Sequence, residues 1–158
     1  MSKLKDEVNL LRSIPMFSNL PANKLKLLAF ASDRVEYSDK EVLMTQGEDA
    51  DAAYVFITGS ADVLVSTDED SEPSKVAELG PNSFVGDMAI LCDTPRTATI
   101  RANSHLEALR IRKEHMMELI NDTPALAMEV LKEIVQRLAK TTQDLSKAKE
   151  ELSQAKSG

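Results

Sequence analysis

The chain has 158 residues and a mass of 17.4 kDa, which suffices for one compact domain but not for two of ordinary size. Its 19 Lys and Arg face 26 Asp and Glu, a formal net charge of -7, which disfavours a general binder of nucleic acid or of anionic membranes. The longest apolar run, six residues from Ala52, is far shorter than the ~20 of a membrane-spanning helix. No signal-peptide stretch follows Met1, so we expect a soluble, cytoplasmic protein.

The first region has the apolar spacing of helices, from Leu4 to Leu11 and again from Asn23 to Ala31. Pro15 separates the two segments, and Pro21 precedes the second, where a helix start tolerates a missing N–H. We therefore expect two short helices ahead of the main body of the domain.

From about Arg34 to Ile111 the pattern changes to short β-branched and aromatic stretches. These stretches cover residues 42–44, 54–57, 63–65, 76–79 and 97–101, and turn residues separate them at Gly47, Gly59-Ser60, 68–73 and Gly80-Pro81-Asn82. Many short strands at regular spacing predict a barrel, a roll or a sandwich. The acidic run at 68–72 lacks the glycine and final glutamate of a calcium loop, so we interpret it as the tip of a hairpin.

The third region is helical, with a short segment at 112–120, a break at Asp122-Thr123-Pro124 and a long helix from about Ala125 to Ala155. At 1.5 Å per residue this helix is on the order of 45 Å long, more than a domain of this size covers. We divide the chain accordingly into a main domain, 1–124, and a C-terminal helix, 125–158, that acts as a lid or a dimerisation element.

The long helix carries residues that alternate in steps of three and four. They are Leu131, Ile134, Leu138, Thr141, Leu145, Ala148, Leu152 and Ala155. This is the a/d stripe of a coiled coil, and a parallel homodimer is its simplest partner. In the alternative, the stripe packs on the chain's own roll, although Val130 and Val135 on another face are available for that packing. Thr141 is an unusual residue at a seam position and needs an explanation.

The most informative stretch is F-V-G-D-M-A-I-L-C-D-T-P-R-T-A-T-I-R-A, residues 84–102. Gly86 permits a backbone conformation closed to other residues, and Asp87 to Leu91 can form one helical turn whose free N–H groups bind an anion. Arg96 follows at the start of a strand, where its guanidinium can fold back over the same anion. The residues themselves therefore indicate a phosphate held by backbone donors and one arginine.

This stretch resembles the phosphate-binding cassette of the cyclic nucleotide-binding domain family, F-G-E-[LI]-A-L-L followed by P-R-[STA]-A. Gln46-Gly47-Glu48 with the segment 54–59 resembles that family's G-[DE]-x-x-x-x-x-Y-x-I-x-x-G strand pair. The resemblance runs from about Phe17 to the long helix. It implies a mainly β fold, a double-stranded β-helix or jelly-roll-like β-roll of about eight strands with flanking helices. It also implies that the cyclic phosphate lies on the cassette turn and that the C-terminal helix covers the base.

Carried over position by position, the resemblance gives a set of expected ligand-binding residues. They are Val85, Gly86, Asp87, Met88, Ala89, Arg96, Thr97, Ala98, Thr141 and Thr142. Backbone donors come from Gly86, Met88, Ala89 and Ala98, and the salt link to the phosphate comes from Arg96. Asp87 replaces the family's glutamate, whose carboxylate accepts from the ribose 2'-hydroxyl, and it reaches about one C–C bond less far. In the alternative, Asp87 is an acid that favours the helix dipole.

The residues expected near the base leave the ligand open between cAMP and cGMP. The Thr97 hydroxyl can bond an equatorial phosphate oxygen or, with a syn purine, the amino group of guanine. In the dimeric bacterial catabolite activator branch of the family, a Thr-Ser pair on the long helix contacts the adenine amino group, and Thr141 and Thr142 correspond to it here. A base contact would explain the polar seam residue, and a threonine that only tunes the seam is the alternative. We favour cAMP.

Other function classes find little support. The single cysteine, Cys92, excludes an internal disulfide and a thiolate metal cluster, and we expect it to act as a small hydrophobe. His105, expected on a strand, and His115, on a helix, are too few for a cupin-type metal enzyme, so we interpret both as surface residues and expect no metal. Neither a Walker loop nor a Ser/His/Asp grouping is found, so we expect no enzyme activity.

The sequence therefore predicts a non-catalytic cyclic nucleotide sensor that signals through its C-terminal helix to a protein partner as yet unknown. A helix-turn-helix would need ~60 more residues, so we expect no direct DNA binding. Two alternatives stay open. The chain is either a structural dimerisation module whose pocket no longer binds nucleotide, or a fragment of a longer catabolite-activator-like regulator.

Overall fold

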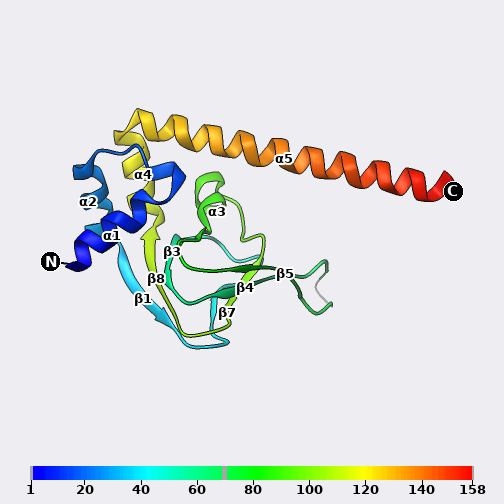
Figure 1. Ribbon diagram of the computed structural model, residues 1–158, viewed down its shortest axis with the longest axis horizontal. Coiled ribbons are helices and arrows are strands. Elements are labelled where there is room, and N and C mark those ends of the chain that lie inside the picture. The colour runs from blue at the N-terminus through cyan, green and yellow to red at the C-terminus, as the bar shows by residue number, and fades with distance from the viewer. Residues whose placement is uncertain (1, 69–70, 158) are drawn as a thin grey trace.

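The computed structural model describes residues 2–68 and 71–157 (Figure 1). Three helical elements come first: α1 (Ser2–Arg12), the 3-10 turn η1 (Pro15–Phe17) and α2 (Ala22–Ala31). The strands are β1 (Asp33–Tyr37), β2 (Val42–Met44), β3 (Ala52–Thr58), β4 (Ala61–Val65), β5 (Ser74–Leu79), β6 (Phe84–Val85), β7 (Thr99–Ala102) and β8 (Leu106–Arg112). The helix α3 (Asp87–Cys92) lies between β6 and β7, and α4 (Lys113–Asp122) and α5 (Pro124–Ser157) end the described chain.

The strands form two four-stranded antiparallel sheets, with orders β1-β8-β3-β6 and β2-β7-β4-β5. Their inner faces share one cluster of buried side chains, in which Tyr54 and Phe56 of the first sheet meet Met44 and Ile100 of the second. Two sheets closed over a common apolar interior and flanked by helices form a β-roll. The predicted fold class is confirmed.

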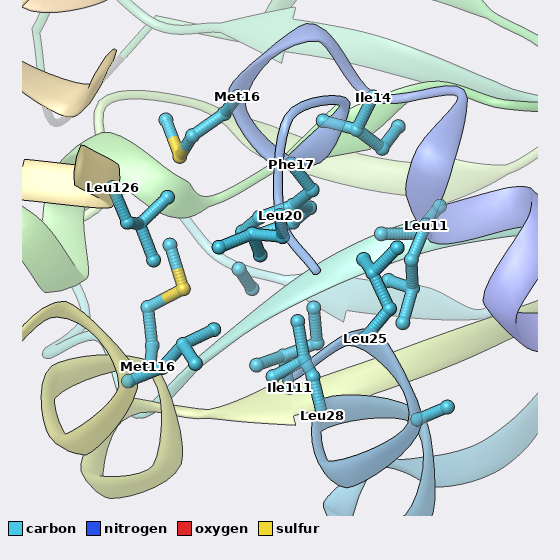
Figure 2. Close-up of a cluster of buried hydrophobic side chains, with 14 of the residues drawn as sticks. Leu11, Ile14, Met16, Phe17, Leu20, Leu25, Leu28, Ile111, Met116 and Leu126 are labelled. Carbon is cyan, nitrogen blue, oxygen red and sulfur yellow. The ribbon is translucent and has the colours of Figure 1, made fainter. Parts of the chain in front are cut away.

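A second core lies on the outer face of the first sheet, where the helices pack (Figure 2). Because side chains alternate along a strand, β3 points Tyr54 and Phe56 into the roll and Ala53 and Val55 outward against the helices. Phe17 of η1, 0% exposed, lies in this outer cluster. The strand is buried on both faces, which explains why residues 52–57 are an unbroken apolar run.

The helix α5 has 34 residues, so at 1.5 Å per residue it is about 51 Å long. Its first turns pack on the outer core through Leu126 and Val130, with Ile134 partly buried. Every residue from 138 to 155 is exposed, and in Figure 1 this half of the helix extends past the roll. None of the helices within 2–68 and 71–157 is long and apolar enough to cross a lipid bilayer.

Two expectations about packing are wrong. Val135 was expected to pack within the chain beside Val130, but it is 55% exposed. A helix turns about 100° per residue, so Val130 and Ile134 share the packed face and Val135 is rotated away from it. Cys92 is likewise exposed rather than a small core residue, because Ile90, two residues earlier, takes the buried side of the short helix α3.

Candidate ligand-binding site

A cavity of about 250 Å³ opens beside the turn between β6 and α3. The side chains and backbone that line it come from both sheets and from α3. Eight of the lining residues are those expected from the sequence between the end of β6 and β7, namely Val85, Gly86, Asp87, Met88, Ala89, Arg96, Thr97 and Ala98. The structure thus brings the two halves of the sequence motif to one cavity.

Gly86 allows the chain to turn from β6 into α3. It has φ +81° and ψ 1°, a left-handed conformation that glycine adopts without steric cost, and it is the N-cap residue of α3. A Cβ built on it would lie 2.5 Å from Nη1 of Arg96 and 3.2 Å from Cε of Met44. Both the backbone angle and the close approach of Arg96 therefore require glycine here.

The Arg96 side chain is buried at the cavity, with 4% of its surface exposed. Its Nη1 donates to the Gly86 carbonyl at 2.9 Å, and its Nη2 donates to the Ala52 carbonyl at 2.5 Å. Burial lowers the pKa of Arg96, while the nearby Tyr54, Asp51 and Glu48 act to raise it. Because arginine stays protonated at neutral pH, this places a desolvated cation next to the first turn of α3.

The backbone of Arg96 is fixed to the loop that contains the other half of the motif. The Arg96 N–H donates to the Glu48 carbonyl at 2.8 Å, and the Gly47 N–H donates to the Arg96 carbonyl at 2.8 Å. Gly47, at φ +89°, forms the turn that allows this pair of bonds. The two sequence motifs are thus two sides of one hydrogen-bonded structure.

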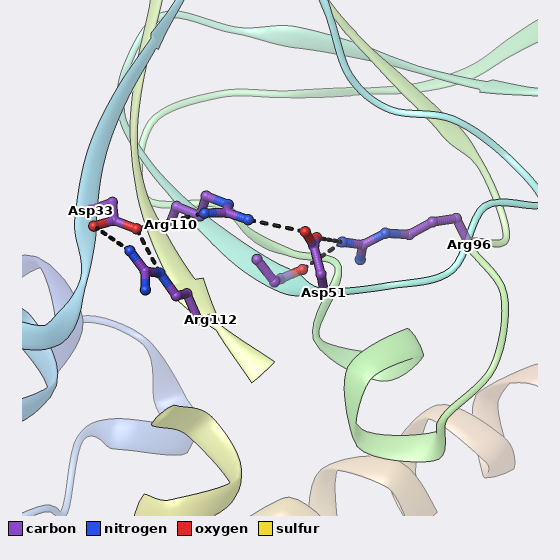
Figure 3. Close-up of polar contacts among 6 residues, drawn as sticks. Asp33, Asp51, Arg96, Arg110 and Arg112 are labelled. Atoms are coloured by element: carbon purple, nitrogen blue, oxygen red, sulfur yellow. Dashed lines mark hydrogen bonds and ion pairs between the residues drawn. The ribbon is translucent and has the colours of Figure 1, made fainter. Parts of the chain in front are cut away.

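Arginines and aspartates alternate in an ion-pair network that ends at Arg96 (Figure 3). Asp51 is 4.0 Å from Nη2 of Arg96 but 3.0 Å from Nη2 of Arg110, and its side chain is 73% exposed. Farther along, Arg110 and Arg112 both contact Asp33. Since the shorter contact of Asp51 is with Arg110, Arg96 is only weakly compensated and retains positive charge for an anion in the cavity.

The Asp87 carboxylate links the cavity to the long helix. Its side chain is 4% exposed, and Arg137 of α5 donates to it from both terminal nitrogens, at 3.0 Å and 3.4 Å. Arg137 also pairs with Glu133 at 3.0 Å. Burial lowers the pKa of Arg137, but the charges and hydrogen bonds of Asp87 and Glu133 outweigh it, so the pKa is raised. A charged, bidentate contact therefore joins α5 to the cassette.

Thr141 and Thr142 lie elsewhere in this structure. Both are exposed on α5, and their hydroxyls donate to helix carbonyls one turn back, Arg137 at 2.9 Å and Leu138 at 3.0 Å. Neither belongs to the lining of the cavity that contains Arg96. A single chain thus does not bring them to the cassette, and their contact with a base stays a prediction.

Sequence reasoning missed two groups of site residues. Arg137 was not named, although Glu133 and Arg137 form an i, i+4 charge pair that marks this face of the helix. The apolar wall of the cavity was also missed, and it consists of Met44, Val63, Leu79 and Ile100. These four side chains come from strands β2, β4, β5 and β7, so the alternation along each strand is the signal that could have indicated them.

Comparisons with known proteins show which family this chain resembles. The family model described as cyclic nucleotide-binding domain matches residues 34–123. The cAMP-dependent protein kinase regulatory subunit of Blastocladiella emersonii is 31% identical over 134 residues, covering 85% of this chain and 30% of that protein. The cGMP-dependent protein kinase egl-4 of Caenorhabditis elegans is 27% identical over 145 residues, covering 91% of this chain and 18% of that protein.

Among solved structures, the sensor domain of the transcriptional regulator DNR from Pseudomonas aeruginosa has a similar fold. Its TM-score is 0.81 at 23% identity, and the match covers 90% of this chain and 95% of that one. At that identity the likeness supports the fold alone. The chain spans less than a third of the length of the two curated relatives, so their activities as whole proteins are not carried over to it.

Proposed function

Because this chain belongs to the cyclic nucleotide-binding domain family, we propose that it is a non-catalytic, cytoplasmic sensor that binds cAMP, with cGMP as a second ligand, and signals through α5 to a protein partner. The observation that carries the proposal is the buried guanidinium of Arg96, which lies beside the left-handed Gly86 at the N-terminus of α3. A desolvated cation at this cavity has a cost in folding free energy, which binding of an anionic ligand would offset.

In the proposed complex, the cyclic phosphate lies at the first turn of α3 and against Arg96. The N–H groups of Met88 and Ala89 are in the first turn of a helix, where they have no partner four residues back, and they would donate to the phosphate or ribose. Asp87 would accept from the ribose 2'-hydroxyl. The apolar wall of Met44, Val63 and Ile100 would pack against the sugar and the purine.

The preference for cAMP rests on the long helix. A threonine at position 97 tolerates either nucleotide, since its hydroxyl suits a phosphate oxygen or a syn guanine. The two curated relatives named above are a cAMP-dependent and a cGMP-dependent protein, so the sequence similarity favours neither nucleotide. Thr141 and Thr142 favour cAMP if the helix of a second subunit presents them to the base, as the resemblance implies.

The exposed stripe of α5 supports a parallel homodimer. Leu138, Leu145 and Leu152 are 65%, 67% and 57% exposed, although leucine side chains at heptad positions are normally buried. Burying a leucine side chain contributes about 1.5–3 kcal/mol, so several such residues in each chain are enough to hold two helices together. The dimer would also give each pocket a second helix to cover its opening.

Signalling would use the contact between Asp87 and Arg137. The Arg137 guanidinium already donates to both oxygens of the buried Asp87 carboxylate, so a ribose hydroxyl that bound the same oxygens would have to share them and would weaken that contact. Nucleotide binding would therefore favour positions of α5 in which Arg137 has released Asp87. The size of this population shift depends on how much more tightly the nucleotide binds those positions. The helix, presented to another protein, would be the output.

Titration with a fluorescent cAMP analogue, followed by competition with cAMP, cGMP and non-cyclic AMP, tests the proposal. We expect saturable binding that the cyclic nucleotides displace and AMP does not. Arg96→Ala should remove a charge-assisted contact of about 1.5–3 kcal/mol, a roughly ten- to hundredfold loss of affinity. Arg101→Ala, on the exposed face of β7, is the matched control and should bind as the wild type does.

Two results would contradict the proposal. Binding that Arg96→Ala leaves unchanged would show that the ligand lies elsewhere. Absence of saturable binding below millimolar nucleotide would favour the alternative of a structural dimerisation module with a pocket that no longer binds.

A further inference from the structure

Two glutamates and a histidine meet on the outer face of the first sheet, away from the nucleotide cavity. Glu36 of β1 pairs directly with Glu107 of β8 in the antiparallel register. His105 precedes Glu107 by two residues, the spacing at which side chains of an extended backbone lie on the same face. This is the face of Leu109, which packs against the helices, and the opposite face of Leu106, which points into the roll.

The chain geometry brings one ligand atom from each residue into a small volume. The nearest suitable atoms of Glu36, His105 and Glu107 all lie within 4.8 Å of one another. His105 was expected on a strand, but it lies one residue before β8, at the end of the loop from β7. Glu36 and His105 are exposed and Glu107 is half-buried, so all three side chains are accessible to an ion from solvent.

The electrostatics of this cluster favour a cation. Carboxylates directly opposite each other on neighbouring strands repel, and the register of β1 and β8 imposes such a pair. Arg34 compensates part of this charge, because its Nη2 lies 3.3 Å from Oε2 of Glu107. That ion pair is solvent-accessible and contributes little, so a divalent ion that binds both carboxylates would displace it readily.

The backbone at His105 is held in place by the neighbouring turn. Gly59, at φ +87°, approaches so closely that a Cβ on it would overlap the His105 carbonyl oxygen. Next to it, the Ser60 N–H donates to Oγ of Ser104 at 3.1 Å. The backbone of His105 is thus held relative to β8 by packing rather than by the loop alone, so the histidine keeps its place beside the two glutamates.

We propose that Glu36, His105 and Glu107 bind a divalent transition-metal ion of the zinc class, at a site separate from the nucleotide cavity. Zinc accepts both imidazole nitrogen and carboxylate oxygen, and three protein ligands leave its fourth position to water. Metal–ligand distances of about 2.0–2.2 Å put tetrahedral ligand atoms roughly 3.4 Å apart. Closing from 4.8 Å to that spacing requires only side-chain rotation of these accessible residues.

Isothermal titration of the untagged full chain with zinc chloride, after removal of metal with a chelator, tests the site. We expect one ion per chain. His105→Gln and Glu36→Gln should each weaken binding by at least about tenfold, because loss of even an outer-shell partner of a metal ligand typically costs that much. His115→Gln and Glu114→Gln change the same residue types on α4 and should leave the affinity unchanged.

A second readout separates metal binding from folding. Zinc should raise the unfolding temperature of the wild type, because an ion bound to the native state stabilises it by mass action, and it should not raise that of His105→Gln. Cobalt in place of zinc should give the visible absorption of a four-coordinate ion. The proposal is overturned if zinc shows no saturable binding, if His105→Gln binds as the wild type does, or if His115→Gln is the variant that loses the ion.

Discussion

The roll and the outer half of α5 use the same kinds of apolar residue in opposite ways. In the roll, β3 is covered on both faces, and Val55 and Phe56 are 0% exposed. In α5, every residue from 138 to 155 is exposed, including three leucines. Because burial of apolar surface stabilises a fold, the contacts within the roll are enough to account for its structure. The outer half of α5 has apolar residues that no contact within this structure buries.

The two regions meet at one contact. Arg137 is the last residue of α5 within 124–155 that is even partly buried, and its guanidinium binds Asp87 of the cassette. Before it, Val130 and Ile134 attach the helix to the outer core. The boundary between the self-contained region and the exposed one therefore lies at the candidate ligand site, as the proposed sensor function would require.

The largest expected effect comes from making the same substitution, leucine to alanine, in each of the two regions. Leu109→Ala removes a fully buried side chain from the outer core and should lower the free energy of unfolding by about 2–5 kcal/mol. Leu145→Ala removes the same atoms from an exposed site and should change it by less than about 0.5 kcal/mol in dilute protein. Chemical denaturation measures both values.

Leu145→Ala has a second expected result, in sedimentation or light scattering. It should shift the chain from dimer toward monomer, which Leu109→Ala in its folded fraction should not do. Equal destabilisation by the two variants in dilute protein would mean that the outer half of α5 packs on its own roll.

Substitutions at three glycines separate the effect of a left-handed backbone from the effect of the close approach of Arg96. Gly86→Ala combines a left-handed φ with a clash against Arg96, so it should lower the free energy of unfolding by about 1–3 kcal/mol and abolish measurable nucleotide binding. Gly47→Ala has the left-handed φ but open space around the new Cβ, and it should cost about 1 kcal/mol. Gly80→Ala has neither feature and is the control, measured by denaturation and by titration of the same samples.

If Gly86→Ala and Gly47→Ala weaken nucleotide binding equally, backbone strain alone accounts for the effect. The close approach of Arg96 to Gly86 would then have no part in the site.

Loss of the contact between the two regions should have a smaller effect on nucleotide binding. It should lower the stability of the fold but raise the affinity for the nucleotide. Arg137→Met leaves the buried Asp87 without its cation, which should lower the free energy of unfolding by about 1–3 kcal/mol. The same variant should bind cAMP severalfold more tightly, because the ribose no longer competes with Arg137 for the carboxylate. Lys140→Met, on an exposed turn of α5, is the control for the lost positive charge. Weaker cAMP binding in Arg137→Met would instead make Arg137 a support for the pocket.

Local features of the fold and of the site could be predicted from the sequence. The stretch 42–44 is the strand β2, and the turn expected at 87–91 is the helix α3, Asp87–Cys92. Such features depend on neighbours in the chain, such as Gly86 before a helix start. The cavity lining from Val85 to Ala98 belongs to the same group, because both halves of the motif lie within one short segment.

Features that depend on distant residues could not be predicted in the same way. Arg137 and Asp87 are 50 positions apart, and nothing in either segment indicates which carboxylate the arginine reaches. The two-residue strand β6 is too short for any periodic signal, and it exists because β3 pairs with it. The exposure of Val135 and Cys92 follows from the rotation of each helix about its axis, which is set by what the helix packs on.

The smallest expected effect concerns the base. Thr141→Ala removes a hydroxyl that in this chain donates only to its own helix, so the free energy of unfolding should change by less than about 0.5 kcal/mol. If the helix of a second subunit presents Thr141 to the purine, the ratio of cAMP to cGMP affinity should nevertheless change severalfold, since one neutral hydrogen bond contributes about 0.5–1.5 kcal/mol. Ser146→Ala, farther along the exposed helix, should leave the ratio unchanged. An equal loss for both nucleotides would argue that Thr141 tunes the helix seam and that the base is recognised elsewhere.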